Sequence, residues 1–206
     1  MALNFANNNS LSAITTLPAS ISGGGMTLIS EQTASSSASI SFSLDNSYDK
    51  YEFKFIDINA QTNGANFQFN FSTDGGSNYN VTKTSSFFIA QNRENGTNSS
   101  LQYQGFGRDL AQSTSDQRLS SEGAGDDNNQ NLNGSLNIYN PSSSVFVKHY
   151  IGNSANRKYS SNQLTYLQMT SYYAGYGNTT SPINSIIFRM SSGNIDAGTI
   201  KMYGVS

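Results

Sequence analysis

The sequence predicts an all-β fold, a jelly-roll-like antiparallel β-sandwich of about 8–10 strands with an extended N-terminal arm. Composition gives the first reason: only 12% of the 206 residues are charged and 35% are hydrophobic, yet aromatic residues reach 12%. Ser, Asn, Thr and Gly supply the polarity, and these residues favour turns and exposed strand faces over helices. Patterning gives the second reason, because short alternating apolar stretches recur between clusters of Gly, Asn, Asp and Ser.

Residues 1–25 form the predicted arm, which ends in a run of three glycines at 23–25. Its apolar residues follow no sustained period of a strand or a helix. Two interpretations stay open: the arm packs on its own domain, or the glycines act as a hinge and the arm docks on a neighbouring subunit. In the second interpretation the partner-binding residues are Leu3, Phe5, Leu11, Ile14 and Leu17.

Residues 26–206 form the predicted sandwich domain. Residues 91–131 are the least apolar part of it and form a long polar excursion, in which we expect short strands or partner contacts. A turn or two of helix has room only at 107–119. Strands are expected at 26–30, 38–44, 50–58, 66–72, 85–90, 100–106, 133–140, 144–152, 163–176, 183–190 and 197–205.

Residues 51–71 read YEFKFIDINAQTNGANFQFNF and predict two partner strands joined by a turn. Polar residues alternate with the aromatic residues, which indicates strands with one solvent-exposed face. The apolar residues move from odd-numbered to even-numbered positions near Phe55 and Ile56. This shift predicts a β-bulge there, or a strand buried on both faces. The chain has few aliphatic residues with which to build a core, so we expect the rings to point inward. These rings belong to Phe53, Phe55, Phe67, Phe69 and Phe71.

The sequence holds no recognisable catalytic constellation and predicts a protein that is not an enzyme and uses no cofactor. With 0 Cys, it has no thiolate zinc site and no Cys nucleophile. The single histidine, His149, lies in an alternating strand pattern typical of a structural residue. Glycosidases need two convergent carboxylates, and nothing in the spacing of the acids indicates such a pair. A polysaccharide depolymerase is therefore the least favoured alternative.

The loop GDDNNQN at 125–131 is rich in oxygen ligands, which makes it a candidate calcium site. A twelve-residue calcium loop starting at Asp127 has Leu132 where Gly is needed and Ile138 where Glu is needed. The pattern fails, so we predict a polar turn and no metal site.

Charge and hydropathy exclude two classes of partner. The net charge of -2 offers no basic field for phosphates, which disfavours nucleic acid. No stretch approaches the roughly 20 apolar residues of a membrane helix. The first residues also lack the positive and apolar regions of a secretory signal, so no cleaved export signal is expected.

The stretch YLQMTSYYAGYGN groups three tyrosines that are candidates for surface recognition, Tyr172, Tyr173 and Tyr176. Amphipathic Tyr rings beside Gly suit contacts with protein or sugar. Tyr is also a common strand residue, so an ordinary structural role is the alternative.

Three stretches resemble a recurrent module in predicted virion proteins of tailed phages, particularly marine and cyanobacterial ones, which are labelled tail-fibre-like or structural. The stretches are YDKYEFKFIDINAQTNGANFQFNFSTDGGSNYN, NLNGSLNIYNPSSSVFVKHYIGN and SSGNIDAGTIKMYGVS, and the resemblance covers most of residues 28–206. It implies a place in a virus particle assembled in the host cytoplasm, and leaves open head, tail or fibre.

Together the resemblance and the residues predict an accessory structural protein of the virion, either a capsid decoration (cement) protein or a fibre component. Its expected partners are the major capsid or tail proteins and copies of itself, with a homotrimer as the expected oligomer. The alternative is a host-recognition module that binds cell-surface polysaccharide through its Tyr-bearing loops.

Overall fold

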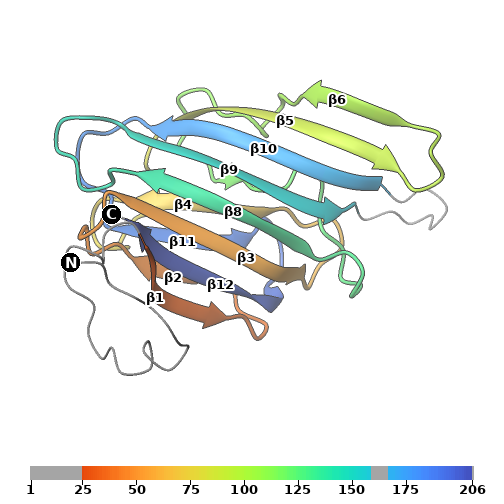
Figure 1. Ribbon diagram of the computed structural model, residues 1–206, viewed down its shortest axis with the longest axis horizontal. Helices are drawn as coiled ribbons and strands as arrows, with labels where there is room; N and C mark the ends of the chain where they lie inside the picture. Colours follow the sequence, from red (N-terminus) through yellow and green to blue (C-terminus); the bar gives the residue numbers. More distant parts are fainter. Residues whose placement is uncertain (1–24, 159–166, 206) are drawn as a thin grey trace, which may run out of the picture.

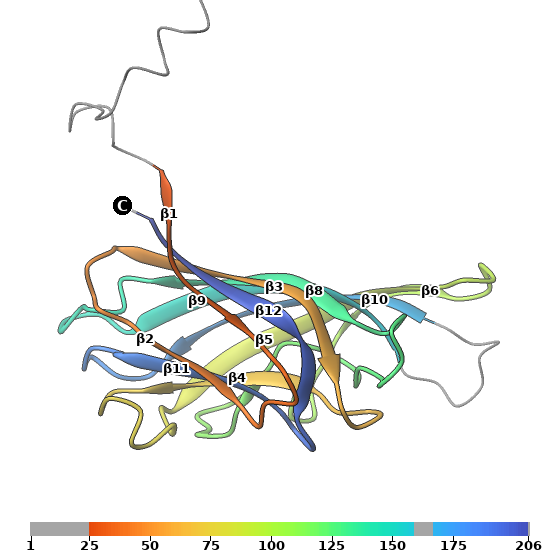
Figure 2. The same ribbon diagram turned by 90° about the horizontal axis from the view of Figure 1, so that it is seen from below.

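The fold is an antiparallel β-sandwich, as the composition and patterning predict. The computed structural model describes residues 25–158 and 167–205, and these residues contain twelve strands and no helix. The strands form one eight-stranded and one four-stranded sheet. Figure 1 shows the larger sheet in front of the smaller one, and Figure 2 shows the two sheets as separate layers. The jelly-roll order of connections stays a prediction.

Every strand pairs antiparallel with its neighbours. In spatial order, the eight-stranded sheet holds β1 (Met26–Thr33), β12 (Ile195–Val205), β3 (Lys50–Ala60), β8 (Leu132–Tyr139), β9 (Lys148–Arg157), β10 (Leu167–Gly177), β5 (Lys83–Arg93) and β6 (Ser99–Tyr103). The four-stranded sheet holds β2 (Ile40–Ser43), β11 (Ser185–Met190), β4 (Phe67–Ser72) and β7 (Gln117–Arg118).

The predicted pairing of the two strands in residues 51–71 is wrong. β3 pairs with β12 and β8, whereas β4 pairs with β11 and β7 in the other sheet. The two strands instead face each other across the sandwich, where the rings of Phe55 and Phe67 meet edge to face at 5.2 Å. A strand with one buried face shows the same alternation in a hairpin and in a sandwich, so the pattern could not distinguish the two.

Phenylalanine rings form the centre of the core between the sheets. The Phe188 ring, on β11, lies within 5.2 to 6.4 Å of five other rings, those of Phe42, Phe53, Phe55, Phe67 and Phe69. The prediction that the phenylalanines of residues 51–71 point inward is confirmed, because all five are 0 to 2% exposed. Edge-to-face and offset contacts of this kind add to the free energy gained by burying the rings.

The predicted β-bulge in β3 is confirmed. The register of β3 against β8 shifts between Phe55 and Ile58, and Asp57 takes a positive φ of 52°. Ile56 is consequently 40% exposed while Ile58 is buried. On the other side of β3, a Cβ added to Gly198 would lie 2.7 Å from the Asp57 carbonyl oxygen. Glycine is therefore needed where β12 passes the bulge.

The polar excursion at 91–131 carries short strands of its own, as predicted, and no helix at 107–119. β6 continues the eight-stranded sheet, and β7, which the sequence did not predict, pairs with β4. Lys83 and Ser113 exchange backbone hydrogen bonds at 2.8 and 3.0 Å. The backbone groups of the excursion form hydrogen bonds with strands of both sheets, and not with one another in a helix. The excursion therefore links the edges of the two sheets.

The described residues hold no helix able to cross a membrane.

The Phe69→Ala substitution is expected to lower the free energy of unfolding by about 3–5 kcal/mol. Phe69 is 0% exposed, and its ring lies 4.9 Å from that of Phe71 and 5.2 Å from that of Tyr150. The matched control is Phe88→Ala, because Phe88 is 41% exposed and should cost about 1 kcal/mol or less. Urea denaturation measures both, and equal losses for the two variants would contradict this core.

Candidate functional site

An aromatic row crosses the outer face of the eight-stranded sheet and consists of Tyr103, Phe88 and Tyr172. The three residues are direct register partners on the adjacent strands β6, β5 and β10. Their side chains are exposed by 63, 41 and 38%. Direct cross-strand partners project from the same face of a sheet, so the three rings form one continuous exposed strip.

The row is held in place by ring stacking and by one hydrogen bond. The rings of Phe88 and Tyr172 stack with centroids 5.0 Å apart and planes 14° from parallel. The Tyr103 hydroxyl donates to Asp109 Oδ2 at 2.7 Å, and this bond raises the pKa of Tyr103. The side chains therefore present their ring faces and edges in a fixed arrangement.

A hollow of about 330 Å³ adjoins the row. Ile151, which is 49% exposed, lies on the next strand and contributes an apolar wall. The side chains of Asn137 and Asn153 add amide groups that can donate and accept hydrogen bonds. The hollow therefore combines aromatic, aliphatic and amide groups on the outer face of the sheet.

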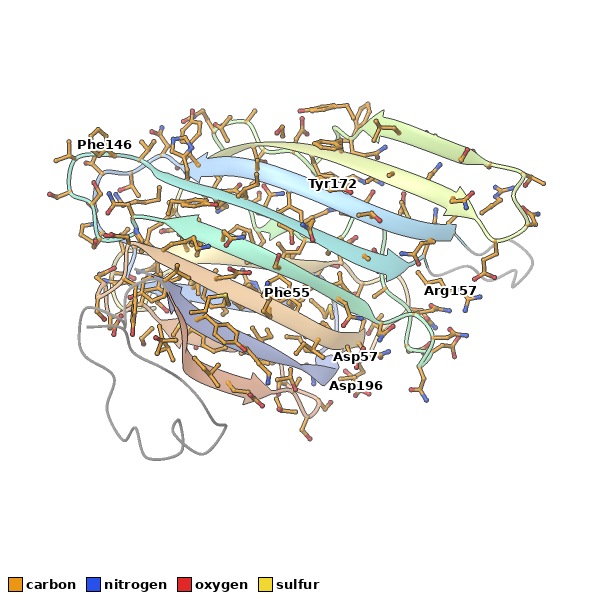
Figure 3. All side chains as sticks on the ribbon, in the orientation of Figure 1. Phe55, Asp57, Phe146, Arg157, Tyr172 and Asp196 are labelled. Atoms are coloured by element: carbon orange, nitrogen blue, oxygen red, sulfur yellow. The ribbon has the colours of Figure 1, made fainter. Side chains whose placement is uncertain are left out.

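Of the three tyrosines predicted for surface recognition, the structure exposes two. Tyr172, labelled in Figure 3, belongs to the aromatic row. Tyr176 is part-exposed, with its ring 5.8 Å from that of the exposed His149. The prediction for Tyr173 is wrong, because it is 1% exposed and its hydroxyl donates to the backbone oxygens of Ser135 and Asn153. Successive strand residues face opposite sides, so adjacent tyrosines cannot share a surface.

Burial raises the pKa of Tyr173 well above its usual value, which keeps the hydroxyl a neutral donor inside the sandwich.

The five predicted arm contacts lie outside the described residues, and their role stays a prediction. They are Leu3, Phe5, Leu11, Ile14 and Leu17.

A polar cleft of about 670 Å³ lies on the outer face of the four-stranded sheet, opposite the aromatic row. Its walls come from β4, β7 and β11 and from the part of the excursion between β6 and β7. Sequence reasoning missed this site, because its residues come from four separate segments. The principal lining residues are Gln68, Asn70, Tyr79, Asp116, Arg118 and Arg189.

Asp116 organises one side of the polar cleft. Arg189 binds it through two hydrogen bonds, Nε to Oδ2 at 2.6 Å and Nη2 to Oδ1 at 2.9 Å. Gln68 and Asn70 donate their amides at 2.7 and 2.9 Å. Burial by itself would raise the pKa of Asp116, but these bonds and the charges of Arg189 and Lys83 outweigh it and lower the pKa. The carboxylate stays ionised and fully bonded at neutral pH.

Lys83 is buried beneath the polar cleft, with 0% of its surface exposed. Its ammonium donates to Asn70 Oδ1 at 2.5 Å and to the Val81 carbonyl oxygen at 2.7 Å. Burial lowers the pKa of Lys83 to about 8, against the opposing effect of Asp116. No sequence signal revealed this lysine, because Lys within an alternating strand is typical of a wet face.

A third hollow, of about 310 Å³, gathers three acids, Asp57, Asp126 and Asp196. Asp57 and Asp196 lie near each other at the ends of β3 and β12 (Figure 3). Asp57 Oδ1 accepts hydrogen bonds from the amides of Asn131 and Asn133 at 2.5 and 3.3 Å. Within 25–158 and 167–205, His, Cys, Asp and Glu form no group of three or more suited to a metal ion.

The free energy of unfolding is expected to rise between pH 8 and pH 10. The folded pKa of Lys83, about 8, lies below the unfolded value of 10.5, so the unfolded chain binds more protons in this window and loses them as pH rises. Lys83→Met should therefore reduce the rise by roughly 1–3 kcal/mol, as measured by urea denaturation at each pH. Lys54→Met, on a part-exposed side chain, is the control, and parallel profiles for wild type and Lys83→Met would refute the linkage.

Comparison with known proteins adds no relative. No protein-family model, curated protein or solved structure matches the chain. Function is therefore inferred from the two outer faces of the sandwich and from the residues that form them.

Proposed function

We propose that the chain is a non-enzymatic accessory structural protein of a phage virion, which acts through contacts of the outer face of its eight-stranded sheet. The place in a virion rests on the resemblance of the three sequence stretches, and the aromatic row supports the contact surface, because three large rings lie exposed side by side on that face. Leu101, which is 73% exposed on β6, extends the apolar surface. Contiguous apolar patches on a soluble protein mark sites of contact with a partner.

The energetics of the row suit a contact surface. Covering a large apolar side chain contributes about 1.5–3 kcal/mol, and a stacked ring loses little conformational freedom when a partner covers it. A virion offers many equivalent sites, so even a modest contact repeated in a symmetric oligomer gives firm attachment. A homotrimer is our proposal for that oligomer, and the major capsid or tail proteins are the proposed partners.

The arm at residues 1–25 is proposed as a second contact, on sequence grounds alone. It is uncharged and carries spaced apolar residues before a glycine run. Such a segment can reach a neighbouring subunit or the particle surface while the sandwich keeps its own fold.

A second candidate function is recognition of a neutral host glycan at the same surface. The observation that favours it is the hollow beside the aromatic row, where Asn137 and Asn153 flank the stacked rings of Phe88 and Tyr172. Ring faces pack on the apolar faces of sugars, while amides bond sugar hydroxyls. A host-recognition module would use this hollow in place of protein contacts.

The Ile151→Lys substitution is expected to weaken attachment of the protein to particles that lack it by tenfold or more. Ile151 lies beside the row and is 49% exposed, so a lysine there would place a charge in the contact at a cost in stability within about 0.5 kcal/mol. Co-sedimentation with particles measures attachment. Ser41→Lys is the matched control, because Ser41 is exposed on β2 of the other sheet.

Unchanged attachment of the Ile151→Lys protein would rule out this face as the particle contact. A neutral glycan array separates the two candidates. Binding that Tyr172→Ala abolishes would favour host recognition, whereas absence of glycan binding together with loss of particle attachment favours the structural role.

A further inference from the structure

Two arginines and a glutamine form a row across the outer face of the four-stranded sheet. Gln68 on β4 pairs with Arg189 of β11 on one side and with Arg118 of β7 on the other. Neighbouring strands lie about 4.8 Å apart, so the two arginine backbones are separated by roughly 10 Å. Both arginine side chains line the polar cleft.

The two arginines differ in whether an acidic side chain pairs with them. Arg189 is bound by Asp116 through the two short hydrogen bonds given above. Arg118 is part-buried, yet its guanidinium has neither a hydrogen bond nor an ion pair within the described ranges. Arginine carries five donors in a planar fork and stays charged at neutral pH. Arg118 is thus a desolvated cation whose donors are free to bind a ligand.

Glu122, whose charge acts on Arg118, already forms ion pairs with two other cations. Glu122 pairs with Arg108 at 3.0 Å and with Lys158 at 3.5 Å. Burial and the charge of Arg108 lower the pKa of Arg118, and Glu122 only partly opposes them. The single carboxylate of Glu122 is therefore shared with Arg108 and Lys158, and it only partly compensates the charge of Arg118.

The remaining cleft groups are suited to hydroxyls. Thr114 and Ser115 line the cleft and carry hydroxyl groups, and Asp109 adds a carboxylate that can accept bonds from hydroxyl groups. Asp109 and Asp116 also repel a ligand with two or three negative charges. The combination favours a single carboxylate on a body rich in hydroxyls, and a volume of about 670 Å³ lies within the range of ligand pockets.

We propose that the polar cleft binds an acidic sugar of the uronic acid class, with the Arg118 guanidinium as the carboxylate-binding group. Arginine and carboxylate match as a bidentate pair, which gives both affinity and orientation. The Thr114, Ser115 and Asp109 side chains take the sugar hydroxyls. Asp109 contacts both the cleft and the aromatic row, but the carboxylate-binding group is Arg118, which lies outside the row, so this proposal does not depend on the proposed function.

The test titrates the full chain with D-glucuronate, D-glucose and inorganic phosphate by isothermal calorimetry and by NMR chemical shifts. D-glucuronate is expected to bind at least about tenfold more tightly than D-glucose, because the charge-assisted bond to Arg118 is lost with glucose. Phosphate is expected to bind more weakly than D-glucuronate. Added salt should weaken D-glucuronate binding, because the charges are only partly buried.

Arg118→Gln should weaken D-glucuronate binding at least about tenfold, and Arg93→Gln, the same change on β5 of the other sheet, should leave it unchanged. Equal thermal midpoints for the two variants exclude unfolding as the cause. The proposal is overturned if D-glucose or phosphate binds as tightly as D-glucuronate, if D-glucuronate does not bind, or if Arg118→Gln retains full binding.

Discussion

The contact of Phe188 with the rings of the facing sheet is the interaction on which the rest of the structure depends. Phe188 lies 5.2 and 5.3 Å from Phe53 and Phe55 of β3, and it also packs on Phe67 and Phe69 beside it. These rings lie at the centre of the buried apolar cluster, whose removal from water drives folding. With the two inner faces joined in this way, both outer faces remain available for other chemistry.

The two outer faces have opposite chemistry, and the polar excursion contributes to both. Its strand β6 carries Tyr103 of the aromatic row, while the segment before β7 forms one wall of the polar cleft. Asp109 connects the two, because it accepts the hydrogen bond of Tyr103 and also lines the cleft. The part of the chain with the fewest apolar residues is therefore the part that shapes both candidate sites, as is common for long segments on a rigid scaffold.

Much of the fold could be predicted from the alternation of apolar and polar residues along the strands, whereas much of the candidate surface could not. Alternation reports which residues share a face, so the buried rings and the bulge near Phe55 were predicted correctly. It does not report which strands pair, so β3 and β4 were wrongly placed side by side. The same limit applies to the sites: Tyr172 was found from sequence, but its register partners Phe88 and Tyr103 come from distant segments. Arg118 belongs to a two-residue strand with no pattern of its own.

Hydroxyl-radical footprinting of the chain, free and within purified particles, tests most directly the claim that the aromatic row is the contact surface. If the aromatic row is the contact surface, we expect Tyr103, Phe88 and Tyr172 to be oxidised several-fold more slowly in the particle. Tyr79, which lines the polar cleft on the opposite face, should be oxidised at the same rate in both states. Equal rates for the aromatic row in both states, or protection confined to Tyr79, would contradict that claim.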